Sequence, residues 1–467
     1  MKPSKRGYLL ICLMGILLSP VRPIVFAGEW VSGPMLGHQA HREMRIWVET
    51  RNAESVKLDY WIQGDRTTLQ SLEVTRPGPT PAGVQPILFE LPLLEMGTTY
   101  AYRLYLDGEL QEFDYPLEFS TTELWEWRRN DNPPDFSFLL GSCAYINDPP
   151  YDRPGDPYGQ GTEIFRQMAR AGADFMLWGG DNIYLREADF SSRSGIWYRF
   201  SKNRSTADFQ PLLAAMPHYA IWDDHDYSSN DGNRAYPFKG ETTEAFQRYW
   251  ANPSWGLPEL PGTFGTFYWG DAAFILMDNR TYRDDSNFDP ERYPEKSQYG
   301  NAQREWLKQT LLHVTDFKTY GGKPLYPHRF IVTGNPFLAT VMAGSDGHAN
   351  YPRDRDSILA FIEEEQIEGV FFLTGDVHHS GFYRLELDNG IVVHDLTSSA
   401  LSSGPWRDVA STPKARDPAL VEGTLVGDNN FCKISLTGRA ADRKIQIQCF
   451  DSEGGLIWER RVSSKAP

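Results

Sequence analysis

Four short apolar runs in this chain each end at residue types that bind metal ions. Runs of this length that are bounded by glycine and turn residues are typical of buried β-strands. Ligands of open α/β sheets bind beyond the carboxyl ends of the strands, so four strand ends in one sheet can bring their side chains together there. The runs start at Phe136, Asp174, Tyr219 and Val370 and lead, in that order, to Cys143; to Asp181 and Tyr184; to Asp223, Asp224 and His225; and to Asp376 and His378. The pattern predicts a polynuclear metal site with thiol, phenol, carboxylate and imidazole groups.

The first 27 residues have the pattern of a secretory signal peptide. A basic start precedes an apolar stretch over residues 8–18, which is too short for a stable membrane span. We therefore expect export to the periplasm or the medium; a retained N-terminal anchor is the alternative. The 467-residue chain has a formal net charge of −16, which disfavours binding to nucleic acid or anionic lipid, and bound cations would offset part of it. We expect the exported protein to be a monomer.

The rest of the chain divides into two parts by its pattern. Residues 28–122 alternate with period two, which predicts a small all-β sandwich of the fibronectin or immunoglobulin type. Residues 123–135 are polar, end in two prolines and are interpreted as a linker. Strand and helix patterns mix over residues 136–463, which predicts an α/β domain of mixed sheets flanked by helices. Its last part, residues 406–463, returns to β patterning, and we expect it to pack on the edge of that domain.

Cys432 and Cys449 flank a predicted hairpin that turns over residues 438–442. In the predicted register the two cysteines face each other within disulfide range. Export permits a disulfide, and two reduced core cysteines are the alternative. Either outcome leaves Cys143 without a natural partner.

The residue types after the first two runs favour iron. Asp181 follows two glycines, which allow close approach of the backbone, and its carboxylate can bridge two metal ions. Tyr184 can reach the same site from the turn, and a packed aromatic ring is the alternative. A phenolate is a hard anionic ligand that suits a trivalent ion, and a thiolate from Cys143 would add negative charge. Together they favour iron over zinc or magnesium alone.

The segment Asp223–Asp226 places four polar side chains directly after an apolar run. Burying several carboxylates together is costly without a cation, which favours a metal site. The alternative is a helix cap or a solvated loop. Asp224 is the better ligand of the first two acids, and His225 can contact phosphate or protonate a leaving group.

Two further segments complete the predicted site. Asp376 and His378 are expected to share one side of an extended segment, so that both reach the cluster, while His379 points away. Arg280 follows another predicted strand. It can clamp phosphate through its fork of donors, or it can pair with Asp278 or another acid as a structural residue.

Five motifs, taken in order, resemble those of the alkaline phosphatase D family of metallophosphoesterases, the PhoD-like proteins. They are Gly141-Ser142-Cys143, Gly180-Asp181-Asn182-Ile183-Tyr184, Trp222-Asp223-Asp224-His225-Asp226, Leu276-Met277-Asp278-Asn279-Arg280-Thr281-Tyr282-Arg283 and Gly375-Asp376-Val377-His378. The segment 33–38 also resembles the opening of that family's N-terminal sandwich domain. One such motif is weak, whereas five in order are specific, and the resemblance covers nearly all of the mature chain.

The resemblance implies a calcineurin-like metallophosphatase core with Fe³⁺ and one or two Ca²⁺ ions as cofactors. By resemblance, the iron ligands are Cys143, Asp181, Tyr184 and His378, with Asp376 nearby, and the calcium position is formed by Asp181 and Asp224, with Asp223 close by. His225 would lie beside the phosphate. The implied activity is that of an exported alkaline phosphatase or phosphodiesterase that hydrolyses phosphate esters with metal-activated hydroxide.

Two alternatives stay open. A phospholipase D-like or wall-polymer diesterase could use the same scaffold, with Phe190, Trp197 and Tyr198 contacting an apolar or sugar group; packing of these residues on the core is the competing role. A non-catalytic binding protein is the other alternative. Intact ligand types after all four runs argue against it.

Overall fold

Two facing β-sheets form the N-terminal region of the structure, a computed structural model that describes residues 27–127, 132–319, 322–341 and 346–463. One sheet has the strand order β1-β2-β5, and the other has the order β4-β3-β6-β7 with β8 paired to β6. The strands are β1 (Glu29–Gln39), β2 (Glu43–Arg51), β3 (Ser55–Ile62), β4 (Gln70–Thr75), β5 (Gln85–Pro92), β6 (Thr99–Leu106), β7 (Glu109–Leu110) and β8 (Glu118–Ser120). Alternate residues of β6, from Tyr100 to Leu106, fill the core between the sheets.

The predicted all-β region is therefore a two-sheet structure, and its exact boundaries stay predictions. The predicted signal peptide lies outside the described residues except for Ala27, and so do residues 128–131 of the predicted linker. Among the described residues, no helix combines the length and apolar character needed to cross a membrane.

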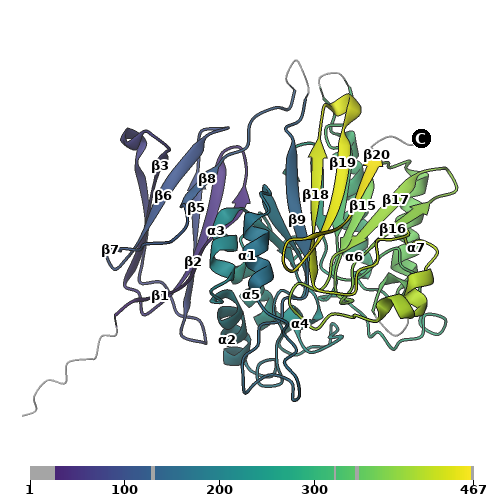
Figure 1. Cartoon of the computed structure of the whole chain (residues 1–467), viewed down its shortest axis with the longest axis horizontal. Helices are drawn as coiled ribbons and strands as arrows, with labels where there is room; N and C mark the ends of the chain where they lie inside the picture. The colour runs from purple at the N-terminus through teal and green to yellow at the C-terminus, as the bar shows by residue number, and fades with distance from the viewer. Residues whose placement is uncertain (1–26, 128–131, 320–321, 342–345, 464–467) are drawn as a thin grey trace, which may run out of the picture.

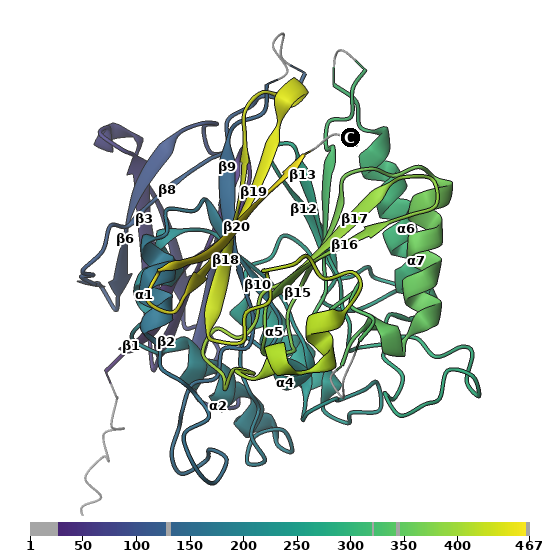
Figure 2. The same ribbon diagram turned by 45° about the vertical axis from the view of Figure 1, so that its right-hand side comes forward.

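Two six-stranded mixed sheets pack face to face in the second region (Figures 1 and 2). The first has the order β11-β10-β9-β18-β19-β20, and the second has the order β12-β13-β14-β15-β17-β16. The first sheet contains β9 (Phe136–Gly141), β10 (Phe175–Gly179), β11 (His218–Ile221), β18 (Asn430–Thr437), β19 (Lys444–Asp451) and β20 (Leu456–Ser463). The second contains β12 (Gly265–Trp269), β13 (Ala272–Leu276), β14 (His328–Val332), β15 (Val370–Thr374), β16 (Gly381–Glu386) and β17 (Val392–Thr397).

Helices cover the outer faces of both sheets, which leaves an apolar core between the sheets and one more on each outer side. The helices are α1 (Glu163–Arg170), α2 (Arg193–Arg204), α3 (Phe209–Ala215), α4 (Asp224–Tyr227), α5 (Lys239–Tyr249), α6 (Gly300–Asp316) and α7 (Pro352–Glu364). Short 3₁₀ helices occupy Arg66–Thr68, His348–Asn350, Val409–Ser411, Pro413–Arg416 and Ala440–Asp442. In Figure 2, α6 and α7 lie on the outer side of the second sheet.

The C-terminal strands complete the first sheet. β18 runs antiparallel to β9, with Cys432 opposite Leu140, and β19 and β20 continue the sheet outward. Half of this sheet thus comes from the end of the chain. Cys432 faces Cys449 as predicted, and both are buried free thiols in this structure.

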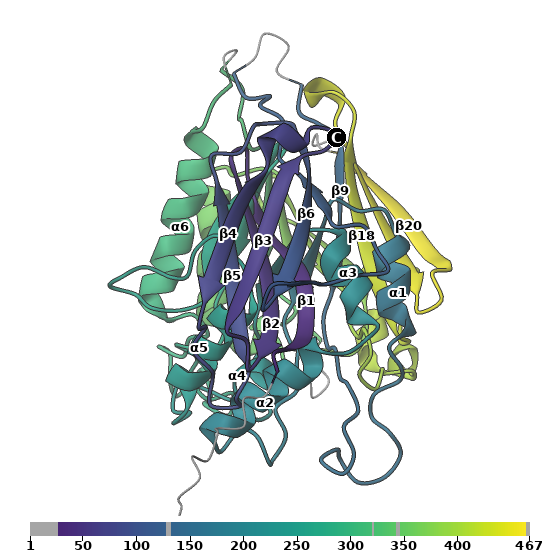
Figure 3. The ribbon, with the colours of Figure 1, turned by 90° about the vertical axis from the view of Figure 1, so that its left-hand side faces the viewer.

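The N-terminal sandwich packs directly on the α/β region, as Figure 3 shows from the sandwich side. Met35 and Trp47 belong to the same buried cluster as the helices of the first sheet. The Trp47 indole Nε1 donates to the Arg248 carbonyl at 2.8 Å. A Cβ at Gly37 would lie 2.2 Å from the Ala251 side chain, so this approach requires glycine.

Candidate metal centre

The four predicted strands end at one site, but they belong to two sheets, whereas the sequence predicted one: β9, β10 and β11 lie in the first sheet and β15 lies in the second. The second residue after β9 is Cys143, after β10 it is Asp181, after β11 it is Asp223, and after β15 it is Asp376. Each of these four residues belongs to at least one of the three ligand groups that the structure brings together. The strand-end rule for α/β sheets explains this convergence.

Left-handed backbone conformations direct the side chains into the site. Cys143, Asp181, Asp376 and His378 have φ angles of 62°, 52°, 71° and 55°. Non-glycine residues seldom adopt this region, and such conformations cluster at functional sites. Asp376 and His378 therefore do not lie on an extended segment, which corrects the prediction. The strand ends at Thr374, and the turn that follows brings both residues to the site.

The first ligand group contains Cys143, Asp181 and His378, whose ligand atoms lie within 4.8 Å of one another. The Cys143 thiol lies 3.7 Å from Asp181 Oδ2, and the Tyr184 hydroxyl lies 3.2 Å from His378 Nε2. Burial raises the pKa of Cys143 to about 12 and raises the pKa of Tyr184 well above its usual value. Both groups would therefore need a nearby cation to ionise near neutral pH.

His378 is oriented for binding through one ring nitrogen. Its Nδ1 lies 2.6 Å from the Gly404 carbonyl and 3.1 Å from the Tyr158 hydroxyl. Because a carbonyl can only accept, Nδ1 carries the proton, and the lone pair of Nε2 accepts a hydrogen bond from the Tyr184 hydroxyl.

Asp181 also belongs to the second group, with Asp224 and His225, which fits the predicted bridging role. One carboxylate oxygen of Asp181 faces Cys143, and the other accepts the His225 backbone N–H at 3.1 Å. Burial and the charges of Asp224 and Cys143 raise the pKa of Asp181 well above its usual value. The free energy needed to ionise Asp181 in this buried site is what a bridging cation would offset.

Asp223, Asp224 and Asp376 form a third group of ligand atoms within the same distance limit. Asp223 is fully buried and accepts a hydrogen bond from Asn279 Nδ2 at 2.7 Å. Its Oδ2 has no hydrogen-bond partner among the described residues. This buried oxygen lies beside the carboxylates of Asp224 and Asp376. Together the three carboxylates offer the oxygen ligands that a hard divalent ion binds.

Asp226 has the helix-cap role that was the alternative to metal binding in this segment. Its carboxylate accepts the backbone N–H of Asp223 at 3.0 Å, of Asn182 at 3.0 Å and of Ile183 at 3.1 Å. Burial raises its pKa to about 7. Asp226 thus fixes the start of α4 and is absent from the three ligand groups found among the described residues.

Arg280 is fully buried and pairs with Asp223. It also lies 3.5 Å from Asp346 and 4.0 Å from Asp224. Arg280 thus pairs with an acid, as one of its two predicted roles requires, and that acid is Asp223. Asp278 instead accepts the Trp222 indole N–H at 2.8 Å.

The His225 ring stacks on the Tyr184 ring, with centroids 4.2 Å apart. Burial lowers the pKa of His225 to about 4, against the opposing charge of Asp224. The imidazole is therefore neutral at neutral pH, with one N–H to donate and one nitrogen to accept.

A cavity of about 420 Å³ opens onto these groups. Sequence reasoning missed several of its lining residues, namely Arg153, Tyr158, Asn230, Asp231, Asp346, Pro405 and Trp406. All seven lie on loops between the named helices and strands, and Arg153 and Tyr158 fall in the polar, proline-rich stretch after Cys143. Trp197 is buried in the core and Tyr198 donates to Asp148, and neither lines this cavity, which favours the packing role considered for them.

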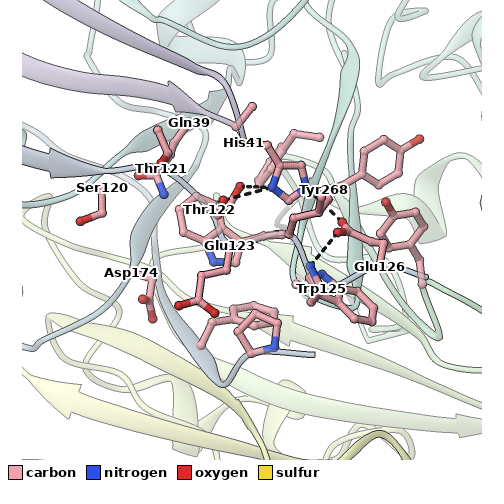
Figure 4. Close-up of a pocket in the computed structure, with 18 of the residues that line it drawn as sticks. Gln39, His41, Ser120, Thr121, Thr122, Glu123, Trp125, Glu126, Asp174 and Tyr268 are labelled. Atoms are coloured by element: carbon pink, nitrogen blue, oxygen red, sulfur yellow. Dashed lines mark hydrogen bonds and ion pairs between the residues drawn. The ribbon is translucent and has the colours of Figure 1, made fainter. Parts of the chain in front are cut away.

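A larger cavity, of about 640 Å³, lies at the junction of the two regions (Figure 4). His41 there contacts Glu126 at 3.2 Å, and Trp125 and Tyr268 contribute aromatic surface. None of the three ligand groups found among the described residues lies in it. The ligand groups therefore open onto the smaller cavity and not onto the larger one.

Residues 138–436 match the PhoD-like phosphatase family, and the chain belongs to that family. It is 26% identical over 295 residues to alkaline phosphatase D of Bacillus subtilis (strain 168), which covers 55% of this chain and 48% of that protein. The match thus spans about half the length of this curated relative.

Two solved structures share the fold. A structure of PhoD has a TM-score of 0.70 at 18% identity and covers 92% of this chain and 91% of that one. The purple acid phosphatase PPD1 from yellow lupin (Lupinus luteus) seeds has a TM-score of 0.61 at 12% identity, covering 94% of this chain and 74% of that one. The predicted α/β phosphatase core of mixed sheets and helices is thereby confirmed at the level of fold.

Proposed function

We propose that this protein is an exported, metal-dependent phosphoesterase that acts as an alkaline phosphatase or phosphodiesterase. The observation that carries the proposal is the convergence of Cys143, Asp181, Asp223 and Asp376 from four strand ends on one buried site. Membership of the PhoD-like phosphatase family supports the same reaction class. The signal-peptide pattern of the first 27 residues supports export.

The donor set fits two kinds of ion. Cys143, Asp181, Tyr184 and His378 would hold Fe³⁺, because thiolate and phenolate suit a trivalent ion. Asp181 and Asp224, with Asp223 and Asp376 close by, would hold one or two Ca²⁺ ions through carboxylate oxygens. When bound, these ions lower the pKa of water and neutralise charge on phosphate oxygens.

The remaining steps belong to side chains of the chain itself. The Gly404 carbonyl keeps the proton of His378 on Nδ1 and so fixes which nitrogen faces the centre. Arg280 balances the charge of Asp223 and holds that carboxylate in place. His225, a neutral imidazole on the cavity wall, can donate its N–H to a phosphate oxygen or to the departing oxygen.

Asp181→Asn tests the proposal directly. Loss of the bridging carboxylate should lower kcat/KM for nitrophenyl phosphate or bis-nitrophenyl phosphate by about a thousandfold or more. Asp208→Asn, at the start of α3 and outside the cavity, is a matched control that should retain activity. Unchanged turnover in Asp181→Asn protein would overturn the catalytic assignment.

Elemental analysis and a visible spectrum test the metal assignment. An iron–phenolate centre should absorb visible light, and Tyr184→Phe should remove that absorption. An active enzyme that is colourless and free of iron would refute the assignment of Tyr184. Comparing the monoester, the bis-ester and a phospholipid as substrates would separate a phosphatase from a phospholipase D-like or wall-polymer diesterase.

A further inference from the structure

Arg153 is a cation at the cavity wall that no carboxylate neutralises. It is exposed and lines the cavity of the candidate metal centre. No described Asp or Glu lies within 4.0 Å of its guanidinium, whereas most arginines near the site are paired, as Arg186 is with Asp152 and Arg280 is with Asp223. Five aspartates line the same cavity, and Arg153 is the single Lys or Arg among the described lining residues. The positive charge of Arg153 is thus available to a ligand.

The loop that carries Arg153 is held in place by its neighbour Asp152. The Asp152 carboxylate accepts the Asp148 backbone N–H at 2.6 Å and the Tyr145 hydroxyl at 3.0 Å. It also pairs at 3.1 Å with the buried guanidinium of Arg186. These contacts hold the backbone next to Arg153 in place, so the loop presents Arg153 to the cavity.

Aromatic contacts connect Arg153 to the metal centre. Its guanidinium lies 4.4 Å from the centre of the Tyr158 ring, within cation–π distance. The Tyr158 hydroxyl lies 3.1 Å from His378 Nδ1. One ring therefore separates Arg153 from a proposed metal ligand, which places the cation beside the site that would hold the reacting phosphate.

A different loop supplies Pro405 and Trp406 to the same cavity. The Trp406 backbone N–H donates to the His378 carbonyl at 2.8 Å, and its ring stands edge-on to the His379 ring with centroids 5.7 Å apart. The leaving group of a bound ester would thus have a fixed aromatic side chain and a free guanidinium as neighbours.

We propose that Arg153 binds a second anionic group on the leaving group of the substrate. The favoured substrates are then phosphate esters or anhydrides whose leaving group carries another phosphate, an inference that rests on the proposed phosphoesterase function. Water attacks the terminal phosphorus, the bond from phosphorus to the leaving oxygen breaks, and that oxygen takes a proton. The products are inorganic phosphate and the leaving group, which keeps its second phosphate.

AMP and ADP provide a matched pair of substrates. Attack on AMP releases uncharged adenosine, whereas attack on the terminal phosphate of ADP releases AMP with its own phosphate. Arg153→Gln should lower kcat/KM for ADP by about 10- to 100-fold, the usual effect of losing a charge-assisted bidentate contact, and should change kcat/KM for AMP by less than about threefold. Arg153→Lys should give an intermediate value for ADP. Arg193→Gln, an exposed arginine on α2 that pairs with Glu241 outside the cavity, is the control and should match the wild type.

Binding of the uncleavable methylene analogue of ADP, measured by calorimetry, gives a readout that does not need turnover. Its Kd should rise by about 10- to 100-fold in Arg153→Gln protein. Equal losses with AMP and ADP, no loss with either, or a wild-type enzyme that cleaves AMP and not ADP would each overturn the proposal. A wild-type protein that cleaves neither the nitrophenyl esters nor AMP nor ADP overturns the proposed function. An unchanged Kd in Arg153→Gln protein overturns this inference on its own.

Discussion

Single residues at the candidate centre have backbone conformations that their side chains do not favour. Cys143, Asp181, Asp376 and His378 all have positive φ angles. Each such residue costs about 1–3 kcal/mol and persists only because its surroundings hold it there. The backbone conformations that place the ligands of the centre therefore lower the free energy of unfolding.

His378 allows this cost to be measured. Asparagine tolerates the left-handed region, whereas valine, which is β-branched, does not. Both His378→Asn and His378→Val remove the imidazole, but the valine variant should have a free energy of unfolding lower by about 1–2 kcal/mol. Denaturant unfolding in the presence of a chelator measures the difference.

The same two substitutions at His394 form the control. His394 lies within β17, an extended strand that favours valine. There the asparagine variant should be the less stable of the two. Equal stabilities at position 378 would show that the left-handed conformation stores no energy.

At the scale of single residues, the sequence predicted which ligand residues lie together, but it did not predict the backbone conformations that bring them together. Residue types at strand ends identify Cys143, Asp181 and Asp376, because the rule for α/β sheets is independent of the loops. The turn at Asp376 and His378 was not predicted, because it depends on contacts with distant segments, such as the Gly404 carbonyl on His378. Arg153 was missed for the same reason: its loop is fixed by the pairing of Asp152 with Arg186.

Among the elements, β18 connects the two ends of the α/β region. The predicted hairpin register is confirmed, since Cys432 faces Cys449 and Ile434 faces Ile447. The alternation of apolar residues specified this local pairing. The antiparallel pairing of β18 with β9, almost 300 residues earlier, is non-local, and no pattern within either strand specifies it.

Ile434 tests whether β18 is a core strand. Its side chain is buried between the two sheets, and its register partner in β9 is Phe138. Ile434→Ala should lower the free energy of unfolding by about 2–4 kcal/mol through lost burial and the cavity left behind. Ser435→Ala, on the other face of the same strand and less buried, should change it by about 0.5 kcal/mol or less. Similar small effects at both positions in urea unfolding would mean that β18 is not part of the core.

At the scale of the whole molecule, the two regions contact each other through a buried hydrogen bond as well as through apolar packing. Tyr249 of α5 donates a hydrogen bond to the carboxylate of Glu49 on β2, close to Arg204 of α2. Glu49 is fully buried. Because Met35 and Trp47 of the sandwich share a core with these helices, we expect the two regions to unfold together.

Glu49 makes the stability of this junction depend on pH. Burial, partly offset by the hydrogen bond from Tyr249, raises its pKa from the ordinary 4.5 to about 7 in the folded protein. The folded state therefore keeps a proton that the unfolded state releases between those two pH values. By linkage, the free energy of unfolding falls as pH rises through this window, by up to about 3 kcal/mol, and the loss is complete above pH 7.

Glu49→Gln should remove this dependence, because glutamine is neutral and its amide oxygen can still accept from Tyr249. At pH 5 the wild type and the variant should differ little. At pH 8 the variant should be more stable by about 2–3 kcal/mol in urea unfolding. Glu73→Gln, an exposed position on β4, is the control and should follow the wild type at both pH values. Parallel pH dependence of wild type and Glu49→Gln would show that the buried carboxylate keeps its charge on folding, and that Arg204 neutralises it more fully than burial opposes it.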